Sequence, residues 1–173
     1  MSWNNSLFNI TEWTVQNLRN LAWIFGGLAV TTALIASQLC VVFVSTNSIP
    51  YSICLQMRHV TPQKYDLCAF IYKGHKFIKY IIGTEGDTVI NLADAIYVNG
   101  FRVGKAERTS RLTPCNDCKI PKGYVFVAGR HPQSLDSRYK EFGFVKISDL
   151  EGKVLGLVKR DDFKEDTFIN WKD

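Results

Sequence analysis

Charge is missing from a long stretch near the N-terminus: no charged residue and no histidine occurs between Arg19 and Arg58. Glu12 and Arg19 are the only charged residues before residue 45. The apolar segment 21–44 exceeds the roughly 20 residues that cross a bilayer. The basic region that precedes the apolar core of a cleaved secretory signal is also missing. The sequence therefore predicts a short segment 1–20 and an uncleaved, single-pass anchor at 21–44, with a buried core helix as the alternative.

Further absences limit the classes of function. The three histidines, His59, His75 and His131, lack the spacing of metal ligands, so we expect no metal and no cofactor. The positive excess lies after residue 44, where 20 Lys and Arg (21 less Arg19) stand against 15 Asp and Glu (16 less Glu12). This excess is dispersed and no nucleic-acid motif accompanies it, so it favours a phospholipid membrane and not nucleic acid as partner. A chain that is 46% hydrophobic and 21% charged is not disordered.

Helical periodicity is absent after residue 58, where short apolar runs alternate with turns that contain glycine and proline. Asn99-Gly100 is the sequence of a tight hairpin turn. The fold class is therefore mainly β: an N-terminal transmembrane helix followed by one small, mostly antiparallel β-domain at 45–173. The run 51–57 is either a core strand or a strand whose outer face rests on lipid. The expected strands are 51–57, 67–72, 77–82, 88–90, 95–98, 101–103, 124–128, 142–147 and 154–158.

A serine follows the apolar run directly. Ser48 lies four residues after its end and two residues before Pro50. This places a hydroxyl where the chain leaves the bilayer. A serine in an exit turn is the structural explanation, since Ser, Asn and Pro all favour turns. A nucleophile at the membrane surface is the functional one.

Lys79 stands inside an apolar strand. Strand alternation puts Phe77, Lys79 and Ile81 on one face and apolar residues on the other, so hydrophobic neighbours flank the lysine on either face. A lysine in such surroundings loses hydration, its pKa falls, and the neutral amine can act as a general base. The alternative is a lysine of an edge strand that reaches solvent or prevents aggregation.

A third polar stretch follows a strand. Asp136 and Arg138 can form an ion pair that fixes the loop, and the hydroxyls beside them can reach a nearby amine. Taken alone, the stretch is typical of a hydrogen-bonded turn. Its sequence is Ser134-Leu135-Asp136-Ser137-Arg138-Tyr139.

Two of the five cysteines, Cys115 and Cys118, lie in a polar loop. A disulfide that staples this loop fits a periplasmic domain. Half of a zinc site is one alternative, but a second pair of ligands is missing. A redox pair is the other, although Pro121 and Gly123 disfavour the helix that such a pair requires.

Together these stretches resemble the type I signal peptidase family and, within it, the conjugative-transfer (TraF-type) branch. The resemblance implies a Ser/Lys peptidase domain in which Ser48 is the nucleophile and Lys79 the general base. It also implies that Thr46 helps to form the oxyanion hole, that Ser134 orients the lysine, and that Asp136 with Arg138 supports the site. The matching stretches are Thr46-Asn47-Ser48-Ile49-Pro50, the run 77–87, Val98-Asn99-Gly100, the run 134–139 and Phe142-Gly143-Phe144-Val145.

The chain departs from the general secretory enzymes at three places. Ile49 follows the serine where many members have Met, and Lys140 and Glu141 are additional residues. The third departure is Ala128-Gly129-Arg130-His131 in place of Gly-Asp-Asn-Arg.

We therefore expect a serine endopeptidase in the bacterial inner membrane, with its catalytic domain on the periplasmic side. Its partner would be a membrane-bound precursor protein, and the TraF-type resemblance implies a conjugative prepilin, with cyclisation through an acyl-enzyme as one outcome. The alternatives are a general leader peptidase and a non-catalytic, membrane-anchored subunit of a secretion or pilus apparatus.

Overall fold

The computed structural model describes residues 4–92, 95–104 and 117–163, with side chains from residue 13 onward. The chain divides into two units, residues 1–39 and 40–173. The first unit is one helix, α1 (Asn4–Gln38), of which Trp13–Gln38 is long and apolar enough to cross a membrane. Its hydroxyls bond back to its own carbonyls: Thr32 Oγ1 donates to the oxygen of Leu28 at 2.8 Å. Because such groups are satisfied within the helix, they are compatible with lipid.

The helix ends earlier than the apolar run predicted. Residues 39–43, which we assigned to the anchor at 21–44, form the strand β1 (Leu39–Phe43). The exposure of side chains alternates along this strand, as in a strand with one covered face. Val41, Val42 and Phe43 are β-branched or aromatic, which favours a strand. Hydropathy alone does not mark the boundary, because apolar residues continue beyond Gln38.

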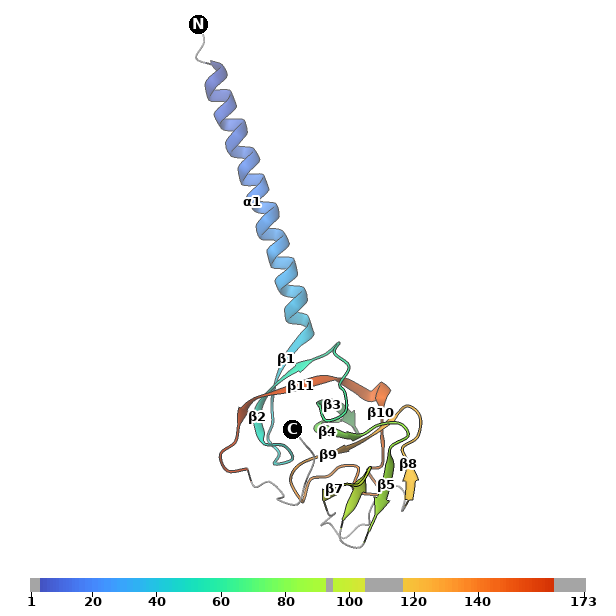
Figure 1. Ribbon diagram of the computed structural model, residues 1–173. Helices are drawn as coiled ribbons and strands as arrows, with labels where there is room; N and C mark the ends of the chain where they lie inside the picture. Colours follow the sequence, from blue (N-terminus) through green and yellow to red (C-terminus); the bar gives the residue numbers. More distant parts are fainter. Residues whose placement is uncertain (1–3, 93–94, 105–116, 164–173) are drawn as a thin grey trace. The chain divides into compact units, whose positions relative to one another are not determined.

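The second unit contains two sheets (Figure 1). The seven-stranded sheet has the order β1-β2-β11-β3-β4-β9-β10, and the four-stranded sheet has the order β7-β6-β5-β8. The pairings of β11 with β2 and β3, of β4 with β3 and β9, and of β5 with β6 and β8 are antiparallel. The expected fold class, an apolar N-terminal helix followed by an antiparallel β-domain, is confirmed. The remaining elements are β2 (Tyr51–Met57), β3 (Leu67–Tyr72), β4 (His75–Gly83), β5 (Thr88–Asn91), β6 (Ile96–Val98), β7 (Phe101–Gly104), β8 (Asp117–Lys119), β9 (Tyr124–Ala128), β10 (Val145–Lys146), the 3-10 turn Ile147–Asp149 and β11 (Leu150–Lys159).

Most of the expected strands occur at the predicted positions. Asn99 and Gly100 both have positive φ, 50° and 81°, as the tight hairpin turn between β6 and β7 requires. The run 142–147 is an exception, because only Val145–Lys146 is a strand and Gly143 turns the chain with a φ of 72°. Strands β1 and β8 were not predicted.

Hydrophobic clusters cover both faces of β4. Ile78, Tyr80 and Ile82 belong to one cluster, and Ile81, with the partly buried Phe77, belongs to the other. Lys79 lies on the same face of β4 as Phe77 and Ile81. Because hydrophobic clusters cover both faces of this strand, the lysine side chain lies in the interior of the domain. At the end of β4, Gly83 allows the two sheets to approach, since a Cβ there would lie 2.6 Å from Ile120 Cδ1 and 2.8 Å from Val98 Cγ1.

Asp87 joins the segment after β4 to the hairpin of the smaller sheet. Its carboxylate accepts hydrogen bonds from Thr84 N at 2.9 Å and Asn99 Nδ2 at 2.5 Å, and it pairs with Lys64 Nζ at 2.7 Å. Partial burial opposes ionisation, but the hydrogen bond from Lys64 and those from Thr84 and Asn99 outweigh it, so the pKa of Asp87 is lowered.

We predict that Asp87→Ala lowers the free energy of unfolding at pH 7 by about 1–3 kcal/mol, because charged hydrogen bonds are lost. The folded-state pKa is the depressed one, so this contribution is present above the unfolded value of about 3.9 and is lost as the pH falls through the folded value. Urea unfolding between pH 7 and pH 3 should therefore show parent and variant converging in acid. A gap that widens in acid would contradict this, and the exposed Asp162 supplies the control Asp162→Ala.

Candidate active site

Ser48 lies on the loop between β1 and β2, which we call the serine loop (residues 44–50). The neighbouring Ile49 is 0% exposed and belongs to the core. The Ser48 carbonyl accepts a hydrogen bond from Arg130 N at 2.9 Å, which ties the loop to the segment after β9. Ser48 itself is half-buried, and Thr46 is exposed. The loop is therefore buried at Ile49 and exposed to solvent at Thr46.

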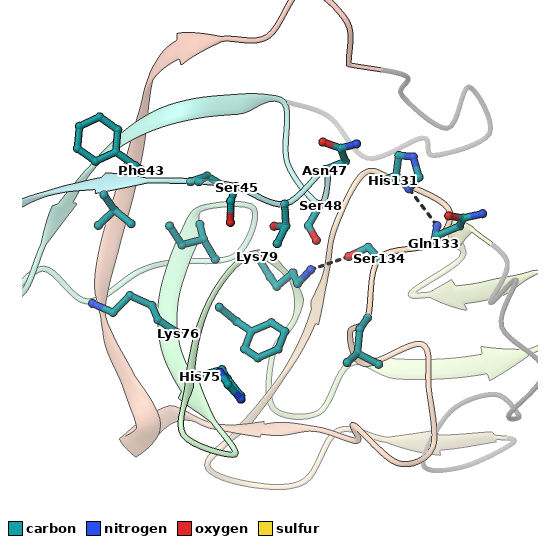
Figure 2. Close-up of a pocket in the computed structure, with 16 residues that line it drawn as sticks. Phe43, Ser45, Asn47, Ser48, His75, Lys76, Lys79, His131, Gln133 and Ser134 are labelled. Atoms are coloured by element: carbon teal, nitrogen blue, oxygen red, sulfur yellow. Dashed lines mark hydrogen bonds between the residues drawn. The ribbon is translucent and has the colours of Figure 1, made fainter.

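Lys79 is buried and hydrogen-bonded. Its side chain is 1% exposed, and its Nζ donates to Ser134 Oγ at 2.6 Å (Figure 2). The Phe77 ring lies 5.8 Å from the same nitrogen. A lysine this deeply buried is uncommon, because removing an ammonium group from water is costly. The hydroxyl of Ser134 and the Phe77 ring are two of the groups that offset this cost.

A pocket of about 610 Å³ brings these groups together. Ser48, Lys79, Thr46 and Ser134 all line it, although they come from the serine loop, β4 and the loop after β9. The Ser48 hydroxyl and the Lys79 amine both point into the pocket (Figure 2). Apolar side chains form much of the remaining wall, among them Val42, Phe43, Val44, Phe77, Ile78 and Leu135.

An ion pair fixes the loop that carries Ser134. Asp136 and Arg138 are both 0% exposed, and Arg138 donates from Nε and Nη2 to the two carboxylate oxygens, each at 2.8 Å. The guanidinium also donates to the carbonyls of His131 at 2.9 Å and Ser134 at 3.4 Å. Burial opposes ionisation of Asp136, but the charge and hydrogen bonds of Arg138 outweigh it and hold the pKa of the carboxyl below its usual value.

Gly129 lets the two loops meet. Its N–H donates to Asp136 Oδ2 at 2.9 Å. A Cβ at this position would lie 2.3 Å from Ser134 Oγ and 2.6 Å from the Ser48 carbonyl oxygen. A side chain here would therefore push apart the loops that carry Ser48 and Ser134. The sequence showed Gly129 and Arg130 only as part of a departure from the family pattern, and their role in joining the loops was missed.

Six residues were proposed from the sequence for the catalytic site, and the structure brings four of them, Thr46, Ser48, Lys79 and Ser134, into one pocket. Asp136 and Arg138 do not line the pocket, and instead they contact the backbone of the loop that carries Ser134. Cys118 is disulfide-bonded. Cys115 lies outside the described residues, so the Cys115–Cys118 pairing stays a prediction. No group of three or more potential metal ligands occurs among the residues that the structure describes.

Comparison with known proteins places this site in context. A model of the family described as signal peptidase, peptidase S26, matches residues 27–158. Signal peptidase I of Bacillus caldolyticus is 32% identical over 109 residues, which cover 53% of this chain and 59% of that protein. The crystal structure of a signal peptidase I from Enterococcus faecalis V583 shares 31% identity and a TM-score of 0.38, covering 53% of this chain and 95% of that one. The chain thus spans under two thirds of the Bacillus protein.

We predict that Asp136→Asn destabilises the domain strongly, because Arg138 then retains a buried charge without its counterion. Breaking a buried pair from one side costs about 3–5 kcal/mol. Urea unfolding followed by far-ultraviolet circular dichroism would measure the loss. Asp162→Asn, which removes an exposed carboxylate, should change the midpoint little. Equal, small effects of the two substitutions would contradict the role given to the pair.

Proposed function

The chain belongs to the signal peptidase family, peptidase S26, and on this premise we propose that it is a membrane-anchored serine endopeptidase with Ser48 as nucleophile and Lys79 as general base. The observation that carries the proposal is the buried Lys79 amine, hydrogen-bonded to Ser134 Oγ at 2.6 Å, in a pocket that it shares with the Ser48 hydroxyl. A serine hydroxyl is a weak nucleophile until a base takes its proton, and a neutral amine can do so.

The burial of Lys79 favours the neutral form that a base requires. Burial removes the hydration that stabilises an ammonium group. The buried carboxylate of Asp136 interacts electrostatically with Lys79 and favours the charged lysine, and Arg138 offsets part of this effect through two hydrogen bonds of 2.8 Å. Ser134 then acts as the positioning residue that keeps the amine directed into the pocket.

The reaction follows from these positions. Ser48 Oγ attacks the substrate carbonyl while Lys79 Nζ accepts the hydroxyl proton. The Ser48 N–H and the Thr46 hydroxyl would stabilise the oxyanion, and each such donor is worth about 3–4 kcal/mol in other proteases. Lys79 then gives its proton to the leaving amine, which leaves an acyl-enzyme on Ser48 that water or another amine resolves.

The helix Trp13–Gln38 is long and apolar enough to serve as a membrane anchor, and this supports our proposal that the substrates are themselves precursor proteins held in the membrane. Only ten positions separate Gln38, the last helical residue, from Ser48. The disulfide at Cys118 supports a periplasmic location of the second unit. The helix would then anchor the chain in the inner membrane of a bacterium.

Two classes of precursor remain as candidates. The motifs that resemble the TraF-type branch favour a conjugative prepilin, whose acyl-enzyme could be closed into a ring by the pilin's own N-terminus. The relatives found by comparison are described as signal peptidase I, which favours general leader peptides. A non-catalytic role in a secretion apparatus is the alternative from a different class, and it requires no reactive serine.

We predict that Ser48→Ala, Lys79→Ala and Lys79→Arg each reduce cleavage of a membrane-bound precursor by about 10³-fold or more, while the protein still folds. Arginine cannot rescue Lys79, because its guanidinium does not release a proton in a protein. Co-expression with a candidate precursor and intact mass of the products would measure cleavage.

Ser148→Ala and Lys146→Arg change exposed residues of the same types and serve as matched controls that should cleave normally. Full processing by a well-folded Ser48→Ala protein would overturn the nucleophile assignment and support the non-catalytic alternative.

The mass of the product separates ring closure from hydrolysis. An amine held beside the ester competes with water through an effective molarity of about 10⁵ M or more. If the pilin N-terminus resolves the acyl-enzyme, the product is about 18 Da lighter than the hydrolysed chain, because no water is added. Acetylating the precursor's N-terminus should then leave only hydrolysis, so that the product has the mass of the linear, acetylated chain. A linear product with an open N-terminus from the unmodified precursor would exclude ring closure and leave the peptidase proposal standing.

A further inference from the structure

Arg160, the first residue after β11, contacts both ends of the serine loop. Its backbone N–H donates to the Pro50 carbonyl at 2.9 Å. Its guanidinium donates from Nη1 to Asn47 Oδ1 at 2.7 Å and from Nη2 to the Val44 carbonyl. One residue, more than 100 positions away in the chain, therefore holds the beginning, the middle and the end of the loop that carries Ser48.

The guanidinium suits this task because it is planar and presents several N–H donors in a fixed arrangement. Two acceptors bound by one rigid group are fixed relative to each other, which a single ammonium group cannot achieve in the same way. Here the acceptors are a backbone carbonyl before the exposed part of the loop and a side chain next to Ser48.

The remaining support of the loop comes from other directions. Arg130 N holds the Ser48 carbonyl, Val44 N donates to the Ser52 carbonyl at 2.9 Å, and Ile49 is anchored in the core. None of these contacts fixes residues 45–47, whose side chains are exposed. Thr46, the proposed oxyanion donor, lies within this stretch, so its position relative to Ser48 depends on the contacts of Asn47 and Val44.

We infer that Arg160 is a positioning residue for the Ser48 nucleophile and the Thr46 hydroxyl. This inference rests on the proposed function. Arg160 lies beyond residues 27–158, the part of the chain that the family model covers. It does not line the pocket and acts only through the loop. Displacing a reacting group by about 1 Å can cost 10²-fold in rate, which sets the size of the expected effect.

The test compares full-length Arg160→Ala, Arg160→Lys, Asn47→Ala and the double variant Arg160→Ala/Asn47→Ala with the parent, using cleavage of a membrane precursor. We expect Arg160→Ala to lower kcat by about 10–100-fold with KM changed less than about threefold, and Arg160→Lys to recover little of it. Because Arg160 and Asn47 share one hydrogen bond, part of each loss is common to both, and the double variant should lose less than the sum of the two single losses. Lys159→Ala removes an exposed positive charge one residue earlier and should cleave normally.

Hydrogen exchange supplies a readout that does not need activity. In Arg160→Ala the amides of Val44 and Arg130, which donate at the two ends of the loop, should exchange faster than in Lys159→Ala, while those of β3 and β4 stay equally protected. The inference is overturned if Arg160→Ala cleaves within twofold of the parent, if the two single losses add, or if exchange of these two amides is unchanged. A failure of the proposed function looks different, since Ser48→Ala would then cleave while Arg160→Ala still loosened the loop.

Discussion

The buried pair of Asp136 and Arg138 is the interaction on which the candidate site depends. The carboxylate holds Gly129 N, and the guanidinium holds the Ser134 carbonyl, so one pair shapes the loop from both ends. That loop supplies the hydroxyl that binds Lys79 Nζ and the Arg130 N–H that binds the Ser48 carbonyl. A buried ion pair is weak evidence for stability, because desolvation offsets much of the attraction. Its value here lies in fixing one conformation for a loop that contacts both members of the proposed dyad.

The second constraint is the double coverage of β4. Since hydrophobic clusters lie on both faces of this strand, Lys79 has no route to water through a neighbouring exposed face. Its amine must find a polar partner inside the protein, and Ser134 provides one at 2.6 Å. Burial and the directed hydrogen bond together produce what a general base needs, namely an amine that is poorly solvated and held in one place. The same packing that stabilises the sheet would therefore serve the proposed chemistry.

The sequence predicted features that depend on local pattern and missed those that depend on tertiary contact. Apolar runs located most strands, and Asn99-Gly100 located a hairpin turn. The helix end at Gln38 was missed because the apolar run continues into β1, and the β-branched and aromatic residues 41–43 were too short a signal without the pairing of β1 with β2. Lys79 could be selected from its apolar neighbours, whereas its hydrogen bond to Ser134, which spans 55 positions and has no local signal, was expected only from the family resemblance. Arg160 gave no signal at all, since its acceptors are a loop amide and a backbone carbonyl.

The order of the strands explains why the proposed dyad requires nearly the whole chain. Ser48 precedes β2, whereas Lys79 lies on β4, and in the seven-stranded sheet β11 separates β2 from β3 and β4. Strands β1 and β2 therefore reach the rest of the sheet through β11, the last strand of the described chain. The residue that follows β11, Arg160, then binds the serine loop directly. Strand β11 thus joins the half of the sheet that carries the serine to the half that carries the lysine, and the residue that follows it holds the serine loop.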